Sequence, residues 1–389
     1  MKYNFDEIVD RKNTNSLKYD FALERKRPED AIPLWVADMD FKTLDEVQNA
    51  LVEKAKHGIF GYSEPKEDYF KALNAWFKKH HDWDIDTSKV VLACGVVFAI
   101  AGVIRALTKE NDAVMICQPV YYPFEETIKV NNRKLVVSEL KNDNGHYVVD
   151  YEDFESKIVE NDVKIFLLCN PHNPVGRVWS REELERMGDI CLKHNVFVIS
   201  DEIHADFTYE CCKHTVFATI KKEFEENSVV CTAPTKTFNL AGLHISNIYI
   251  PNDSVRRKYK LEMDRIGYSQ SNIMGIVACQ AAYENGEEWL SELKTYLKSN
   301  FLFVKEYIKN YIPKLSLVEP EGTYLLWIDC RKLGLSDKEL KELINFKAKV
   351  WVDDGYVFGQ GGSGYIRINI ACPRATLEKA LNNIKNVIS

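Results

Sequence analysis

One lysine of the chain sits where an amine can do covalent chemistry. Lys236 lies in CTAPTKTFNLAGL, where a strand-like apolar run enters a proline-bearing turn among apolar and small residues. Most lysines are surface cations, and this is the ordinary interpretation of an isolated one. In a desolvated, cationic environment, however, the pKa of a lysine falls, and its neutral amine can attack a carbonyl carbon to form a Schiff base.

A carboxylate follows another apolar run. Asp201 comes directly after VFVIS, and a charged group at the end of a buried strand is costly unless a positive charge faces it. The alternatives are a helix N-cap or a structural salt bridge. His204, three residues further on, is either a hydrogen-bonding partner beneath Asp201 or a core histidine.

Two further segments offer backbone and amide donors to a ligand. Gly95, Val96 and Val97 open a predicted helix after the run KVVLAC, and free N–H groups at a helix start suit a phosphate. Asn173 stands between a histidine and a proline, so its stiff backbone can present the amide to a ligand. A plain strand–turn–helix and a simple turn are the alternatives at these two places.

These four features occur in order at successive strand ends, which is where open α/β sheets bind ligands. Pyridoxal phosphate requires this combination, namely an imine-forming lysine, a phosphate cradle and an acid opposite the pyridine nitrogen. Asp201 would keep the ring nitrogen protonated, and Asn173 would donate to the phenolic oxygen. Tyr121 or Tyr122, in QPVYYPF after another strand, could stack on the ring.

Seven short apolar runs rich in β-branched residues must position these side chains. They alternate with segments of helical spacing, such as residues 98–108 and 181–194, and this alternation predicts a mainly parallel sheet covered on both faces. The predicted fold class is therefore α/β, with a seven-stranded, mainly parallel sheet in one large domain. The runs cover residues 89–94, 113–117, 134–138, 164–169, 196–200, 229–232 and 245–250.

The pattern changes after about residue 285, so we predict three regions. Residues 1–45 form an N-terminal arm that packs on the small domain and the active site, and residues 46–285 form the large cofactor-binding domain. Residues 286–389 form a smaller α+β domain, in which a long charged helical stretch precedes strand-like runs at 323–329, 349–354 and 365–371.

Composition excludes several classes of function. The 389 residues carry 51 basic and 58 acidic side chains, and the net charge of −7 argues against a nucleic-acid surface. No apolar run approaches the roughly 20 residues that span a bilayer, and the start carries no secretory signal, so we expect a cytoplasmic protein without membrane contact. The ten cysteines include no CxxC pair and the nine histidines no HExxH, so no metal site is expected.

Several segments together carry a family resemblance. The chain resembles fold-type I pyridoxal phosphate enzymes of the aminotransferase class I/II superfamily, and more narrowly the MalY/PatB-type carbon–sulfur lyases, which are cystathionine β-lyases. The resemblance extends from residue 32 to residue 374. It rests on IPLWVADMDF, HGIFGYS, GVVFAI, QPVYYPF, HNPVGRVWS, SDEIHADF, PTKTFNLAGL, GTYLLWID and GYIRINIACPR.

The resemblance implies roles for individual residues around the cofactor. Lys236 matches the Schiff-base lysine, and Asp201 matches the partner of the pyridinium nitrogen. Asn173 matches the donor to the ring oxygen, and Tyr121 matches the ring that stacks on the cofactor. Tyr62 matches a tyrosine that reaches the cofactor of the other subunit, which implies a homodimer with shared active sites.

The resemblance also implies a substrate site. Arg367, in YIRINIA, matches the arginine that binds the substrate α-carboxylate through two hydrogen bonds, whereas a surface charge at a strand edge is the alternative. Trp35 and Asn173 are assigned to the same substrate site, and His204 is assigned to the cofactor site.

The phosphate contacts are the part of the site where this chain departs from the family pattern. Many relatives carry a serine three residues before the lysine, where this chain has Ala233. The contacts therefore fall to Thr232 or Thr235, and the sequence does not decide between them. Many aminotransferases also place an arginine eight residues after the lysine, and His244 occupies that position here.

The reaction that the resemblance implies is an α,β-elimination. Lys236 would remove the α-proton of an amino-acid thioether, L-cystathionine or another cysteine S-conjugate, and the products would be a thiol, pyruvate and ammonia. An aminotransferase shares every cofactor residue but needs a 2-oxo acid as its second substrate. A lyase with an added regulatory, protein-binding role is a further alternative.

Overall fold

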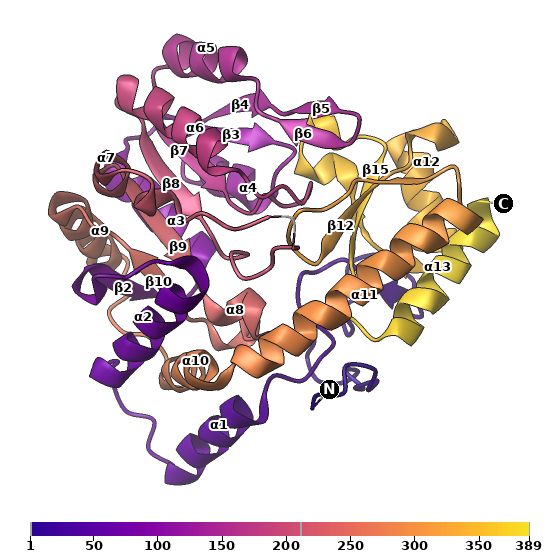
Figure 1. Cartoon of the computed structure of the whole chain (residues 1–389), viewed down its shortest axis with the longest axis horizontal. Coiled ribbons are helices and arrows are strands. Elements are labelled where there is room, and N and C mark those ends of the chain that lie inside the picture. Colours follow the sequence, from indigo (N-terminus) through magenta and orange to yellow (C-terminus); the bar gives the residue numbers. More distant parts are fainter. Residues whose placement is uncertain (1, 211, 389) are drawn as a thin grey trace.

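The computed structural model describes residues 2–210 and 212–388, and its centre is a seven-stranded sheet (Figure 1). Every predicted run of the large domain forms one strand, in the order β2–β10–β9–β8–β7–β3–β4. β10 is antiparallel to both neighbours and the other pairings are parallel, so the predicted fold class is confirmed. The strands are β2 (Val90–Ala93), β3 (Ala113–Gln118), β4 (Lys134–Glu139), β7 (Val163–Cys169), β8 (Phe197–Asp201), β9 (Ser228–Thr232) and β10 (Ser246–Tyr249).

Both faces of this sheet are covered, because successive residues of a strand enter different cores. Val114 and Ile116 of β3 pack with helices α3, α4 and α9, whereas Met115 packs on the opposite face with α5 and α6. The runs therefore lack a polar alternation, as expected for strands buried on both sides. The helices are α3 (Val96–Leu107), α4 (Pro123–Val130), α9 (Asp253–Arg265), α5 (Tyr151–Asn161) and α6 (Arg181–Lys193).

Further helices and a hairpin border this sheet. α1 (Asp45–His57) and α2 (Glu67–His81) both pack against α10 (Ile273–Asn285). The short helices α7 and α8 flank β9 in the sequence, and β5 and β6 pair as an antiparallel hairpin. Their bounds are Lys222–Glu226 for α7, Pro234–Thr237 for α8, Lys141–Asp143 for β5 and His146–Val148 for β6.

A second, four-stranded sheet occupies the C-terminal part, in the order β11–β12–β15–β14. The 25-residue helix α11 runs from the end of α10 to α13 beside this sheet (Figure 1). The bounds are β11 (Ser316–Leu317), β12 (Leu325–Asp329), β14 (Asp353–Asp354), β15 (Tyr365–Asn369), α11 (Glu287–Tyr311), α12 (Asp337–Lys341), which continues into a π-helical segment (Glu342–Lys347), and α13 (Arg374–Ile388).

The single strand expected at residues 349–354 is wrong, because this run forms two strands. β13 (Val350–Trp351) pairs in parallel with β1 (Ile32–Pro33), whereas β14 joins the second sheet. Between them, the N–H of Val352 donates to the side chain of Asn345 at 3.1 Å. The chain thus changes its partner strand at residue 352.

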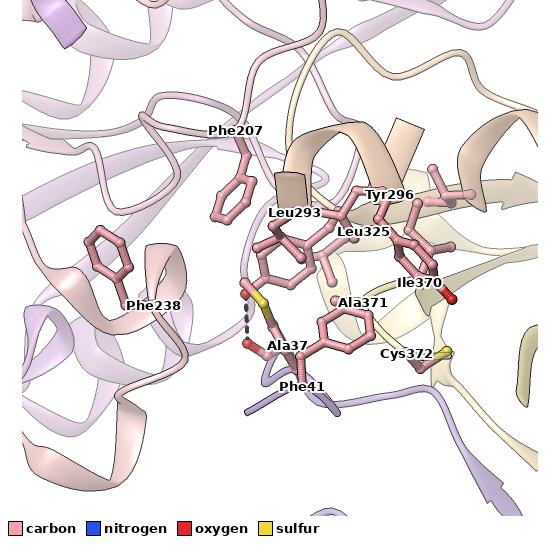
Figure 2. Close-up of a cluster of buried hydrophobic side chains, with 14 of the residues drawn as sticks. Ala37, Phe41, Phe207, Phe238, Leu293, Tyr296, Leu325, Ile370, Ala371 and Cys372 are labelled. Atoms are coloured by element: carbon pink, nitrogen blue, oxygen red, sulfur yellow. Dashed lines mark hydrogen bonds between the residues drawn. The ribbon is translucent and has the colours of Figure 1, made fainter. Parts of the chain in front are cut away.

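The N-terminal segment connects the two sheets. Besides the β1–β13 pairing, Ala37 and Phe41 belong to a buried cluster that also contains Phe238 from the first part of the chain and Leu325 and Ile370 from the second (Figure 2). This packing agrees with an arm that contacts both parts of the chain. The domain limits at residues 45 and 285 stay predictions.

The described residues include helices and cysteines whose character bears on membrane and redox functions. None of their helices combines the length and the apolar character needed to cross a bilayer. Seven free thiols in this part of the chain are buried, and burial raises their pKa, so they pack as small apolar side chains. These are Cys117, Cys169, Cys191, Cys231, Cys279, Cys330 and Cys372.

Candidate active site

A cavity of about 430 Å³ lies at the carboxyl ends of the central parallel strands. Each polar feature that the sequence placed after a strand contributes to its wall, because parallel strands bring their carboxyl ends to one edge of the sheet. Nine of the predicted residues line this cavity: Gly95, Val96, Val97, Tyr121, Asn173, Asp201, His204, Thr235 and Lys236.

The amine of Lys236 has a pKa well below that of an ordinary lysine. The short helix α8 places Lys236 just after β9, and its Nζ donates to the backbone carbonyl of Ala37 at 3.0 Å. Burial and the positive charge of Arg367 lower the pKa of Lys236 to about 8, although two nearby carboxylates oppose the shift. Near pH 8 a large fraction of this amine is therefore neutral, as a nucleophile or a general base requires.

The carboxylate of Asp201 is buried and forms no ion pair within the described chain. It ends β8 and is 4% exposed, and Oδ1 accepts from the N–H of Ile203 at 3.1 Å. By contrast, the neighbouring Glu202 accepts from the N–H of Phe217 and pairs with His214. Burial raises the pKa of Asp201 to about 7, so a cation placed beside it in the cavity would be stabilised.

The raised pKa of Asp201 predicts a pH-dependent stability. This carboxyl ionises near pH 4 when unfolded but near pH 7 when folded, so its ionisation opposes folding increasingly between these values. In the ligand-free protein, Asp201→Asn should therefore raise the free energy of unfolding at pH 8 by a few kcal/mol, on the order of 1.4 kcal/mol per pH unit between the two pKa values. Urea unfolding of the variant and the wild type at pH 5 and pH 8 measures this gain in the free energy of unfolding. An equal gain at both pH values would assign the effect to packing instead.

Arg367 contacts the wall of the cavity through Asn173. Its Nη1 donates to Oδ1 of Asn173 at 2.9 Å. Its Nη2 donates to the carbonyl of Trp35 at 2.8 Å and to the carboxylate of Asp353. Nε is buried and has no partner in the described chain. Arg367 is thus a fixed cation beside the cavity, and its Nε–H remains without a partner in the described chain.

Trp35 and Tyr62 do not line the cavity of this chain with their side chains. The ring of Trp35 stacks on Trp351 with 4.5 Å between the ring centroids, so its contact with Arg367 is made by the main chain. Tyr62 is 96% exposed in the loop between α1 and α2 and lines a separate surface groove. One chain therefore presents Tyr62 outward, away from its own cavity.

The two threonines that the sequence left open lie in different surroundings. The hydroxyl of Thr232 donates to the carbonyl of Asn247 in β10 at 3.0 Å, and Thr232 does not line the cavity. Thr235, one residue before Lys236, does line it. Thr235 is therefore the one placed to contact a ligand there.

His204 contributes a buried, neutral ring to the cavity wall. It is 4% exposed, burial lowers its pKa strongly, and its Nδ1 has no partner in the described chain. The ring packs edge-on against Tyr324, with 6.0 Å between centroids, and no hydrogen bond to Asp201 is described. Within residues 2–210 and 212–388, no group of three His, Cys, Asp or Glu side chains is placed to hold a metal ion.

Ala37 and Asp353 are residues of the site that sequence reasoning missed. The carbonyl of Ala37 accepts from Lys236 and from the hydroxyl of Tyr324, and a main-chain acceptor leaves no side-chain signal. Asp353 holds Arg367, and the signal available was a carboxylate directly after an apolar run. His244, noted as a departure from the family pattern, also lines the cavity.

The α/β sheet with a ligand-sized cavity at its carboxyl edge is typical of α/β enzymes, and comparison with known proteins identifies the family of this chain. The chain belongs to the aminotransferase class I and II family, whose model matches residues 29–384. It is 40% identical to the cystathionine beta-lyase PatB of Bacillus subtilis over 386 residues, which cover 99% of this chain and 100% of that protein.

Two solved structures extend this likeness to the whole fold. A pyridoxal phosphate-bound putative aminotransferase from Clostridium difficile matches with a TM-score of 0.97 and 48% identity, covering 100% of both chains. Cystalysin from Treponema denticola, which contains a pyridoxal 5'-phosphate cofactor, matches with a TM-score of 0.96 and 36% identity. That match covers 100% of this chain and 99% of cystalysin.

Proposed function

We propose that the protein is a pyridoxal phosphate-dependent carbon–sulfur β-lyase. It would convert L-cystathionine or another cysteine S-conjugate, with one water molecule, into a thiol, pyruvate and ammonia. The observation that carries the proposal is the presence in one cavity of an amine with a lowered pKa, Lys236, and a buried carboxylate without an ion pair, Asp201. The 40% identity to a cystathionine beta-lyase supports this reaction over others that use the same cofactor.

The cavity has the donors and acceptors that pyridoxal phosphate requires. Asp201 would hold a proton on the ring nitrogen, because a protonated ring supplies the cation that this carboxylate lacks. The first-turn N–H groups of α3, from Gly95, Val96 and Val97, have no acceptor within the helix and would bind the phosphate. Thr235 would add a hydroxyl to this phosphate site.

Asn173 and Tyr121 would complete the contacts with the ring. Oδ1 of Asn173 accepts from Arg367, which leaves the amide nitrogen of Asn173 to donate to the phenolic oxygen. Tyr121 lines the cavity and packs edge-on against Phe124, with 5.8 Å between centroids, so its ring is held in place for stacking. His204 would add a neutral ring to the same wall.

Each charged residue of the site has a distinct role in the proposed elimination. Pyridoxal phosphate supplies, when bound, an electron-withdrawing ring that stabilises negative charge at the substrate α-carbon. Lys236, with a pKa of about 8, would take the proton from that carbon. Asp201 would keep the ring nitrogen charged, and Arg367 would bind the α-carboxylate and so direct the Cα–H toward the amine of Lys236.

Asp353 is expected to act as a positioning residue for Arg367. Replacing Asp353 by asparagine removes the charge from a hydrogen bond that fixes the guanidinium group. A charged hydrogen bond contributes about 1.5–3 kcal/mol, so the KM for L-cystathionine should rise about tenfold or more. The value of kcat should change less, because carboxylate binding precedes the chemical step.

Steady-state kinetics of the Asp353→Asn variant check this expectation. Asp354→Asn is the matched control, because Asp354 pairs with Arg27 and Lys341 instead of Arg367. Its KM should stay within about twofold of the wild-type value. A lower kcat at unchanged KM in the Asp353 variant would contradict the positioning role.

An aminotransferase is the second candidate, favoured by the 48% identity to a structure described as a putative aminotransferase. Purified protein incubated with L-cystathionine, while pyruvate, thiol and cofactor absorbance are followed together, separates the two. The lyase releases pyruvate and thiol in equal amounts without an added 2-oxo acid. Amino transfer that depends on a 2-oxo acid, without thiol release, would reject the lyase and support the aminotransferase.

We also propose that the protein works as a homodimer in the cytoplasm. Ile59, Phe60 and Tyr62 are 67%, 59% and 96% exposed, and a second subunit that covers this loop would remove apolar surface from water. This exposure supports the expectation that Tyr62 reaches the cofactor of the partner subunit. The free buried thiols suit a reducing compartment.

A further inference from the structure

A second cavity, of about 610 Å³, lies outside the candidate active site. It is bounded by the end of α2, by residues 205–210 and 212–214, and by the first half of α11. It shares no lining residue with the cavity that contains Lys236. Its volume falls in the range of small-molecule sites, roughly 300–1,000 Å³.

Three hydrogen-bonding groups line this second cavity without a partner in the described chain. Lys294 of α11 forms no ion pair with any described residue, and burial lowers the pKa of its ammonium group. The hydroxyl of Tyr209 and Nε2 of His80 are buried and unbonded. Because an unsatisfied buried polar group costs about 1–3 kcal/mol, the unbonded atoms of Tyr209 and His80 favour a ligand that accepts hydrogen bonds.

The carboxylates of the same cavity are already bonded to other side chains. Asp206 accepts from Nε2 of His81 at 2.9 Å, and Glu210 pairs with Lys298 at 2.7 Å. Neither of them neutralises Lys294 through an ion pair. The second cavity therefore holds one ammonium group without an ion-pair partner in the described chain, although the charge of Asp206 attracts it.

We propose that the second cavity binds a small organic monocarboxylate. Lys294 would pair with the carboxylate, and Tyr209 and one tautomer of His80 would donate hydrogen bonds to it. Ala205 and Leu290 offer apolar contacts to the organic part of the ligand.

The charge of the cavity selects a monoanion. One negative charge matches the ammonium group of Lys294, which forms no ion pair with any described residue. A second negative charge, as on inorganic phosphate, would lie near the carboxylates of Asp206 and Glu210. The other two lysines of the lining, Lys213 and Lys298, are already paired with carboxylates and so offset it less. A monocarboxylate is therefore expected to bind more tightly than phosphate.

Calorimetric titration of the purified holoenzyme with benzoate, propionate and inorganic phosphate tests this proposal. At least one of the two carboxylates should bind with a Kd of about 1 mM or tighter. Lys294→Met should weaken this binding at least about tenfold, and Tyr209→Phe should weaken it severalfold. Phosphate should bind more weakly than the carboxylate.

Lys305→Met is the matched control, since Lys305 lies further along α11, outside the second cavity, and pairs with Glu319. Its affinity for the carboxylate should stay within about twofold of the wild-type value. Circular dichroism and thermal melting check that each variant is folded. If Lys294→Met does not fold, Tyr209→Phe, which removes only a hydroxyl, decides the question.

Three results would overturn the proposal: no binding of either carboxylate, binding that is unchanged in Lys294→Met, and a Lys294-dependent preference for phosphate. A carboxylate that binds at Arg367 instead would bind equally well to the Lys294→Met variant, which is the second of these results. Because heat of binding is measured instead of turnover, the outcome is independent of the lyase proposal.

Discussion

Lys236→Ala is expected to lower kcat for cleavage of L-cystathionine by about 10³-fold or more. Lys236 supplies the amine with a pKa near 8. No other lysine lines the described cavity, and the buried His204 has a strongly lowered pKa, which makes its ring a poor base. The variant should therefore lack both the covalent anchor for the cofactor and the base for the α-proton.

A coupled assay for pyruvate measures the effect of this substitution. Lys222→Ala is the matched control, because Lys222 is an exposed lysine that pairs with Glu225 and should be replaceable without loss. Borohydride treatment of the wild-type holoenzyme should attach the cofactor to a peptide that contains residue 236. Retention of more than about a tenth of wild-type activity, or labelling elsewhere, would contradict the assignment.

Asp201→Asn is expected to lower kcat by about 10²–10³-fold while the cofactor still binds. The amide cannot stabilise a positive charge on the ring nitrogen, so the ring would withdraw electrons less strongly from the α-carbon. The same substitution should stabilise the ligand-free protein at pH 8, because it removes the cost of a buried carboxylate. Lower activity together with higher stability is the signature expected of a functional carboxylate.

The neighbouring carboxylate provides a control for this second prediction. Glu202→Gln should lower the free energy of unfolding, because Glu202 pairs with the buried His214 and accepts from a backbone N–H. It should leave kcat within about fivefold of the wild type. Full activity of the Asp201→Asn holoenzyme would exclude a role of Asp201 at the ring nitrogen.

The large sheet was predictable because the amino-acid pattern of each strand is recognisable by itself. A strand buried on both faces, such as β3 or β8, needs apolar residues at consecutive positions, and few other local structures produce such short runs. The run at 349–354 carried the same signal, yet it forms two strands in two sheets. Local pattern predicts that a segment is extended, but it does not say which strand will pair with it.

The wall of the cavity was predictable for a related reason. In a mainly parallel sheet, polar residues directly after each strand must meet at one edge, so the sequence alone groups Asp201, Asn173 and Lys236. The side-chain directions were not predictable. Thr232 and Thr235 are three residues apart, and only the hydrogen bond of Thr232 to β10 separates their surroundings.

The sequence by itself determined which functional groups follow successive strands along the chain. They are the N–H groups of a helix start, an amide, a carboxylate and an amine. Only the tertiary structure decided that Arg367 meets Asn173, 194 residues earlier, and that Asp353 holds it in place. The same folding brought the carbonyl of Ala37 to the amine of Lys236. The physical reason is that hydrophobic periodicity specifies local conformation, whereas charges and main-chain acceptors acquire partners only when distant segments are buried together.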